Sequence, residues 1–385
     1  MNKKIITALI ALTLIVPATS NAANLSNKTL TPTVAILDTA LDSSLPIFNG
    51  RIAKEVCILE WNSCPNGKSF MEGPGSAGLP SSIIAKNGFN HGTQMSSIFI
   101  ANSPNVNIVF VRIIGNTPSG ERQLANEITV VNALDWVYKN KDVLNIQAVT
   151  MAMGHHNLGH GTSYCPNTPA TQLRLKNFVS IGLPVFIAAG NAGDLKRIDW
   201  PSCIDDSISV GAATAQDELA IYSNYDENKI DFIALGNTVA SQPVTGKQIG
   251  VRGTSASTQI AAANWLAVKN VRPGISYQDL YALMRNSAIP AKSTSTIIAK
   301  LISYDSAVKF LNAEEARKSA EEAAKAAALA AAKAAAIESL MKKQEQEIMQ
   351  ILERYNASVL ELTKAKDSSI TALKATIAAE VLKLG

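Results

Sequence analysis

Three residues in distant parts of the chain carry the groups that nucleophilic catalysis needs. Asp38 directly follows an apolar run, His91 precedes a Gly-Thr pair, and Ser255 follows another Gly-Thr pair. A serine hydroxyl becomes a good nucleophile when a neighbouring base takes its proton. An imidazole is that base near neutral pH, and a carboxylate behind it fixes its tautomer and stabilises its cation. The residues therefore predict a catalytic triad.

Asn191 is the expected donor to the oxyanion that forms when a hydroxyl attacks a carbonyl group. It ends the run Ala188-Ala189-Gly190-Asn191, which lies between His91 and Ser255 in the chain. Ser255 would open a helix that continues through residues 260–267. Its backbone N–H would then point at the same oxygen, favoured by the helix dipole.

Each of these residues also has a purely structural interpretation. His91 would be a buried histidine, Asn191 a turn asparagine and Ser255 a helix N-cap. Asp42 lies near Asp38, but only Asp38 directly follows the expected strand. The helical pattern over residues 94–101 and the order of the four motifs favour catalysis.

The order Asp, His, Ser is the subtilisin order and differs from that of chymotrypsin. With Asn191 in place, the chain resembles the subtilisin-like serine proteases (subtilases) from about Thr31 to about Leu311. The segment from Trp200 to Ala212 resembles the part of those proteases behind the specificity pocket. The resemblance assigns substrate contacts to Met151, Ala152, Met153, Gly154, Ala188, Ala189 and Gly190. The expected walls of the specificity pocket, Ala152–Gly154 and Ala188–Gly190, are small and apolar, which favours an apolar side chain before the cleaved bond.

The elements that must position these groups alternate between strands and helices. Patterns over 121–139 and 171–180 predict helices. Short runs rich in Val and Ile suit strands buried on both faces of a parallel sheet; they span 34–37, 107–114, 148–153, 184–188, 207–212 and 231–234. This alternation predicts a doubly wound, mostly parallel α/β sheet, in which active groups gather beyond the carboxyl ends of strands.

Residues 1–23 have the pattern of a secretory signal peptide. Lys3 and Lys4 precede the apolar run 5–16, and small residues follow at 21–23. The apolar run is too short to span a membrane. We expect an exported protein without a membrane span, periplasmic or secreted, whose peptidase domain occupies 24–311. The net charge of +4 is too small to indicate a nucleic-acid partner.

Four cysteines in an exported chain favour disulfides over free buried thiols. Four cysteines allow three pairings. We favour Cys57 with Cys64, which closes a small loop, and Cys165 with Cys203. The second bond would join the loop after the substrate strand to the segment behind the pocket.

No metal or other cofactor is expected. His155, His156 and His160 crowd one loop, but no carboxylate or cysteine completes a ligand set, so a solvated rim is the favoured interpretation. Subtilases often bind calcium in an insertion after the histidine helix. Residues 102–105 pass straight into the next strand, so that loop is not expected, although calcium elsewhere stays possible.

The sequence departs from the family pattern at several positions. The glycine expected after Asp-Thr is Ala40, the expected Ala-Gly pair is Ser96-Ser97, and residues 256–259 replace Met-Ala-x-Pro. None of these changes removes a catalytic group. Only residues 24–37 separate the expected cleavage site from Asp38, so the folded inhibitory prodomain usual in secreted members is not expected between them.

Residues 312–385 form a tail of different composition. Ala323–Ala336 is almost pure alanine, the strongest helix former. Apolar residues then recur at steps of four or three, which predicts one coiled-coil stripe; they are Ile348, Leu352, Tyr355, Val359, Leu362 and, after a gap, Ile370, Leu373, Ile377, Val381 and Leu384. Asp367-Ser368-Ser369 predicts a break and a second N-cap.

Three interpretations of the tail compete: an oligomerisation coil, a docking arm for another protein, or a hairpin that folds back on the protease. Oligomerisation or partner docking is favoured. The whole chain is therefore interpreted as an exported serine endopeptidase that acts on protein or peptide substrates. The alternative is a catalytically silent binding protein that keeps the fold and assembles through residues 312–385.

Overall fold

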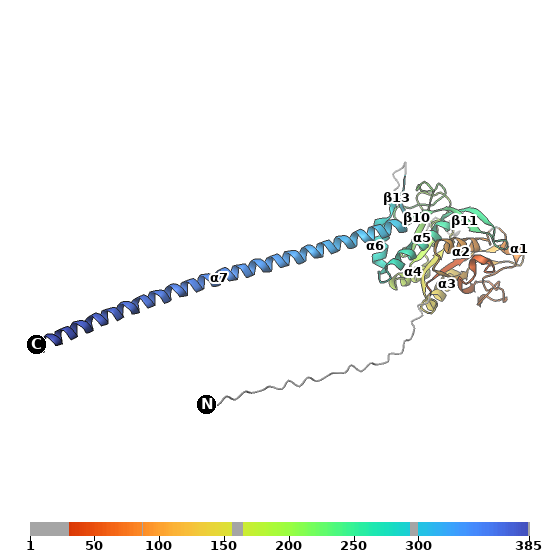
Figure 1. Ribbon diagram of the computed structural model, residues 1–385. Coiled ribbons are helices and arrows are strands. Elements are labelled where there is room, and N and C mark those ends of the chain that lie inside the picture. Colours follow the sequence, from red (N-terminus) through yellow and green to blue (C-terminus); the bar gives the residue numbers. More distant parts are fainter. Residues whose placement is uncertain (1–30, 87, 156–164, 293–298, 384–385) are drawn as a thin grey trace, which may run out of the picture. The chain divides into compact units, whose positions relative to one another are not determined.

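The computed structural model describes residues 31–86, 88–155, 165–292 and 299–383. The chain divides into two compact units, which meet between Ser306 and Ala307. The first unit contains the sheet and its helices, and the second contains most of one long helix (Figure 1). The predicted boundary at 311/312 lies inside that helix.

A ten-stranded sheet forms the centre of the first unit, in the order β13-β14-β10-β9-β8-β7-β1-β4-β2-β3. All its pairs are parallel except β2–β3 and β13–β14. Its strands are β1 Thr33–Asp38, β2 Ile52–Ile58, β3 Phe70–Glu72, β4 Asn107–Arg112, β7 Ile146–Met151, β8 Val185–Ala188, β9 Ile208–Ala213, β10 Phe232–Leu235, β13 Ile289–Pro290 and β14 Lys300–Leu301. Two hairpins complete the strands: β5 Gly115–Asn116 with β6 Arg122–Gln123, and β11 Asn237–Ser241 with β12 Gln248–Arg252.

The strand order reverses beside β1. The chain builds β4 and β2 on one side of β1 and β7, β8, β9 and β10 on the other. Such a reversal opens a crevice beyond the carboxyl ends of the two strands that flank it. The crevice here lies past the ends of β1 and β7, at Asp38 and Met151.

Helices cover both faces of the sheet. The helices of the first unit are α1 Ser81–Ile84, α2 His91–Asn102, α3 Glu127–Asn140, α4 Pro169–Ser180, α5 Thr254–Val271 and α6 Tyr277–Ser287, with a short 3-10 turn at Pro46–Phe48; α7 Tyr304–Lys383 forms the second unit from Ala307 on. Alternate strand residues point to opposite faces. Ala35 and Leu37 join the core beneath α3 and α4, whereas Phe186 packs edge-on against Trp265 of α5. Burial on both faces explains the continuous apolar runs.

The predicted doubly wound α/β fold is confirmed, and all six expected strands are present. The helix expected over 121–139 starts later, at Glu127, because Asn126 caps it by accepting a hydrogen bond from the Thr129 N–H at 3.0 Å. The short strands β3, β13 and β14 and the β11–β12 hairpin have too few apolar residues to be recognised from a period-two pattern.

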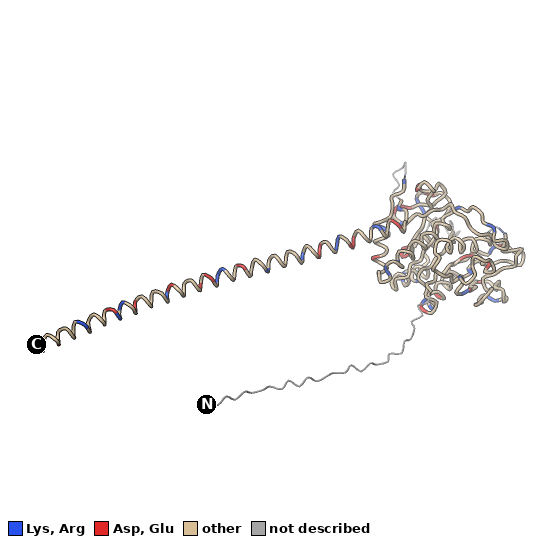
Figure 2. The backbone as a smooth tube through the Cα atoms, viewed as in Figure 1, with Lys and Arg blue, Asp and Glu red and all other residues tan. Residues whose placement is uncertain are grey.

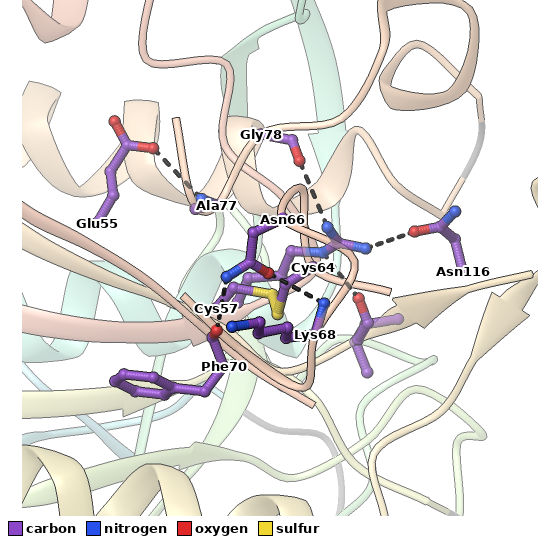
Figure 3. Close-up of a disulfide and its surroundings, with 11 residues drawn as sticks. Glu55, Cys57, Cys64, Asn66, Lys68, Phe70, Ala77, Gly78 and Asn116 are labelled. Carbon is purple, nitrogen blue, oxygen red and sulfur yellow. Dashed lines mark hydrogen bonds between the residues drawn. A yellow bond between two sulfur atoms is a disulfide. The ribbon is translucent and has the colours of Figure 1, made fainter. Parts of the chain in front are cut away.

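Both expected disulfides are present, Cys57–Cys64 and Cys165–Cys203. The first joins the end of β2 to the loop before β3, as Figure 3 shows. Within that loop Asn66 donates to the Phe70 carbonyl at 3.0 Å and accepts from the Lys68 N–H at 3.1 Å. The bond therefore closes a loop that its own hydrogen bonds already shape.

Helix α7 runs through the tail without interruption for 80 residues, a length of about 120 Å. The predicted break at Asp367 is therefore wrong. The Thr371 hydroxyl donates to the Asp367 carbonyl at 2.8 Å, one turn earlier, as in a continuing helix. No proline or glycine lies there to stop it. Figure 2 shows acidic and basic residues interspersed along this helix.

None of the described helices is both long and apolar enough to cross a membrane.

A buried polar pair joins β7 to α5. The Thr150 hydroxyl donates to Gln259 Oε1 at 3.1 Å, and both residues are fully buried. Gln259 Nε2 has no hydrogen-bond partner within the described part of the chain. A buried unsatisfied donor costs about 1–3 kcal/mol.

This pair predicts an asymmetric pattern of stabilities in a Ser255→Ala background, which removes the expected nucleophile. Thr150→Val leaves Gln259 Oε1 without a donor as well, and lowers the free energy of unfolding by about 1–3 kcal/mol. Adding Gln259→Met removes both unsatisfied atoms and raises the free energy of unfolding above that of the parent. Urea unfolding measures all three chains, and a double variant less stable than Thr150→Val contradicts the prediction.

Candidate active site

Asp38 and His91 meet at the carboxyl end of β1. His91 Nδ1 lies 2.8 Å from Asp38 Oδ1 and 3.0 Å from Oδ2. The carboxylate is fully buried and also accepts the Thr39 N–H at 2.7 Å. A buried carboxylate needs such donors because its desolvation is otherwise uncompensated.

Thr39 ties the start of α2 to the end of β1. Its hydroxyl donates to the Phe89 carbonyl at 3.0 Å and accepts the Gly92 N–H at 2.9 Å. A Cβ on Gly92 would lie 2.4 Å from the Ala40 carbonyl oxygen and 2.6 Å from the Phe110 ring. Only glycine allows this approach, and it brings the neighbouring His91 against Asp38.

Ser255 is the second residue of α5. Gly253 makes the turn from β12 into this helix at a φ of 150°, which favours glycine. The Ser255 N–H is among the first N–H groups of the helix, which have no partner within the helix itself. The Ser255 hydroxyl donates to the Ala152 carbonyl at 3.0 Å.

Asn191 follows β8, and Thr254 sets the orientation of its amide. Asn191 Oδ1 accepts the Thr254 N–H at 2.8 Å and the Thr254 hydroxyl at 3.2 Å. The same hydroxyl accepts the Gly190 N–H at 3.2 Å. A backbone N–H can only donate, so Oδ1 faces Thr254 and the amide nitrogen is left to face away from it.

His91, Ser255 and Asn191 line one pocket of about 280 Å³, and Asp38 lies behind His91. Five of the seven expected substrate contacts also line it: Ala152, Met153, Gly154, Ala188 and Gly190. Met151 and Ala189 do not, since both side chains are buried in the core. The pocket is further lined by Gly88, Asn90, Gln94, Arg122, Asp199 and Thr254, none of which the sequence analysis assigned.

Asp199 is the residue of that group with an available sequence signal. It directly precedes Trp200-Pro201, the start of the segment expected behind the pocket. Its carboxylate does not fit a pocket that is apolar throughout.

Of the three clustered histidines, His155 is described and His156 and His160 lie outside the described residues. The His155 ring stacks on Trp200, and its Nε2 lies 2.9 Å from the Ala125 carbonyl oxygen. In the described ranges no three His, Cys, Asp or Glu side chains gather as a metal site would require. Helix α2 ends at Asn102 and β4 begins at Asn107, so the connection is short.

A doubly wound sheet with a carboxylate-paired histidine, a serine and an amide around one pocket has the groups of a serine hydrolase. Residues 30–325 match the model of the subtilase family of peptidases. The chain belongs to this family of serine proteases.

Relatives of established name have low identity but broad coverage. The chain is 24% identical over 304 residues to the major intracellular serine protease of Bacillus subtilis, covering 74% of this chain and 84% of that protein. It is 23% identical over 297 residues to an intracellular serine protease of Paenibacillus polymyxa, covering 72% and 80%. Subtilisin E of Bacillus subtilis is 26% identical over 230 residues, covering 58% and 52%.

Solved structures confirm the fold. A protease from Pseudoalteromonas arctica superposes with a TM-score of 0.58 at 20% identity, covering 73% of this chain and 91% of that one. A prenylagaramide maturation protease superposes with a TM-score of 0.54 at 17% identity, covering 73% and 94%.

The orientation of Asn191 predicts the effect of Asn191→Leu, which keeps the size of the side chain and removes its amide. We expect kcat to fall about 10²–10³-fold, the range measured for such a donor in a subtilisin. KM should change little, because the amide would contact the oxygen only once it becomes charged. Steady-state kinetics on a peptide substrate measure both, and a rise in KM at constant kcat contradicts this role.

Proposed function

We propose that this protein is an exported serine endopeptidase in which Asp38, His91 and Ser255 form the triad and Asn191 supplies an oxyanion donor. The observation that carries the proposal is the Asp38–His91 pair at the wall of a pocket that Ser255 and Asn191 also line. The family match supports the reaction class.

Substrate binding and activation of the serine involve the same carbonyl group. A peptide that adds as an extra strand along residues 152–154 would direct a backbone N–H at the Ala152 carbonyl. The Ser255 hydroxyl donates to that acceptor in the structure. Rotation about its Cα–Cβ bond releases the hydroxyl to donate to His91 Nε2 once the peptide N–H replaces it.

The chemistry then proceeds in two halves. Ser255 Oγ attacks the carbonyl carbon while its proton passes to His91, whose cation Asp38 stabilises. The Asn191 amide and the Ser255 N–H donate to the oxyanion, and His91 returns the proton to the leaving amine. Water, activated by His91, hydrolyses the acyl-enzyme by the same steps.

The hydrogen bond between Ser255 and Ala152 also supports a second candidate, a catalytically silent binding protein. In that case the hydroxyl would remain on the Ala152 carbonyl with ligand bound. The two candidates differ in whether Ser255 reacts.

Export is part of the proposal. Residues 1–23 have the charge, apolar run and small residues of a signal peptide. Both disulfides suit an oxidising compartment outside the cytoplasm. Two relatives are named intracellular proteases, so the location is a property to measure in this chain.

The role proposed for α7 is self-association through the stripe of Ile348, Leu352, Tyr355, Val359 and Leu362. These side chains are 42–71% exposed. Their alternating spacing of four and three is that of a coiled coil, whose partner presents the same spacing. A second copy of this helix meets that requirement.

Covalent labelling tests the catalytic proposal. A fluorophosphonate forms a bond with an activated serine and not with an ordinary hydroxyl. We expect wild-type protein and Ser180→Ala, which lacks an exposed helical serine, to be labelled and Ser255→Ala to be unlabelled. Hydrolysis of a peptide substrate should disappear with the label. A folded wild-type protein that takes up no label supports the silent binding protein instead.

Light scattering of the full chain tests self-association. Leu352→Lys with Val359→Lys places two cations in the stripe, whereas Gln350→Lys with Ala357→Lys places them at the same seven-residue spacing on the other side of the helix. We expect an oligomer for wild type and the second pair, and a monomer for the first pair. A monomeric wild-type protein, or two pairs with the same mass, contradicts a role for the stripe.

A further inference from the structure

The pocket carries a buried carboxylate at the position that a substrate side chain would reach. We propose that Asp199 selects a lysine or arginine side chain immediately before the cleaved bond. This inference rests on the proposed function and names its substrate class. It replaces the apolar preference that the small pocket walls suggest.

Asp199 is held rigidly between the two walls. It is 9% exposed, and its N–H donates to the Ala189 carbonyl at 2.8 Å. The next residue, Trp200, pairs with His155 in an antiparallel bridge, with hydrogen bonds of 2.9 and 3.3 Å. Asp199 is thus fixed on one side to the chain after β8 and on the other to the chain after β7.

Two glycines show how closely the carboxylate approaches the pocket. A Cβ on Gly190 would lie 2.3 Å from both Cγ and Oδ2 of Asp199. A Cβ on Gly154 would lie 2.8 Å from the Trp200 carbonyl oxygen and 3.4 Å from Asp199 Cβ. Both glycines line the pocket, as does Asp199. A side chain on either wall would collide with Asp199 or Trp200, so glycine at both positions lets Asp199 lie between the walls and line the pocket.

Asn224 orients the carboxylate. Its Nδ2 donates to Asp199 Oδ1 at 2.8 Å and to the Ala189 carbonyl at 3.1 Å. Its Oδ1 accepts the Ala192 and Asp194 N–H groups at 2.9 and 3.1 Å. These hydrogen bonds, three of them to backbone groups, hold the Asn224 amide in one orientation and so orient Asp199 Oδ1. A carboxylate has about four acceptor sites, and the hydrogen bond from Asn224 fills one of those on Asp199.

The slot suits a long basic side chain in both of its parts. The walls Ala152, Gly154 and Ala188 offer apolar contact to the methylene stem, and Asp199 offers a charge to its end. A neutral side chain would displace water from the carboxylate without replacing its hydrogen bonds. Arg122 also lines the pocket and packs against Gly88 near the start of α2, where a Gly88 Cβ would lie 2.7 Å from Arg122 Cδ.

Matched peptides that differ in one charge test the inference. Citrulline replaces arginine, and norleucine replaces lysine, with nearly the same shape and no charge. We expect wild-type kcat/KM to be about 30-fold or more higher for each basic residue than for its neutral analogue. In Asp199→Asn the ratios should fall to about 1. Asp205→Asn, which removes an exposed carboxylate outside this pocket, should keep the wild-type ratios.

A ratio measured within one protein is insensitive to how much of that protein is folded. Protection from labelling gives a second measurement that needs no variant: benzamidine, a small cation, should slow fluorophosphonate labelling of wild-type Ser255, and neutral benzamide should not.

Labelled wild-type protein with equal rates for arginine and citrulline overturns the specificity and leaves the protease proposal intact. Asp199→Asn with unchanged ratios also overturns it. Wild-type protein without any label overturns the proposed function, and the specificity with it.

Discussion

The fold of the first unit is arranged around a negative charge buried at the end of β1. Asp38 has no exposed surface, so its carboxylate depends on the Thr39 N–H and on His91 for hydrogen bonds. Loss of such a partner leaves an uncompensated buried charge, which is strongly destabilising. The contacts of Thr39 with the start of α2 and the tight approach of Gly92 therefore serve stability and site geometry together.

A second set of contacts builds the opposite side of the pocket. Thr254 connects the start of α5 to Asn191 and Gly190, so hydrogen bonds join three pocket residues. Asn224 connects the segments after β8 to Asp199. The crevice at the strand-order reversal thus has two rigid walls, one from α2 and one from α5, and the substrate would lie between them.

The sequence was sufficient to predict what depends on local pattern. Buried parallel strands read as apolar runs, and Asp38 and Asn191 are recognisable because each follows such a run. Asp199 was missed because its position in the pocket depends on how its segment packs against the chain after β7 and after β8, which the adjacent Trp200-Pro201 alone does not show. The break expected at Asp367 is absent because a capping sequence alone does not end a helix when the segments on both sides of it continue the helix.

The uninterrupted α7 has a consequence for the survival of the tail beside a protease. Its many lysines and arginines would be potential cleavage points for an enzyme that prefers basic residues. A segment wound into a helix has no free backbone edge to pair with residues 152–154, so it must unwind locally before it can be cut. The alanine-rich composition makes that unwinding costly, so the helical conformation would slow autolysis of the tail.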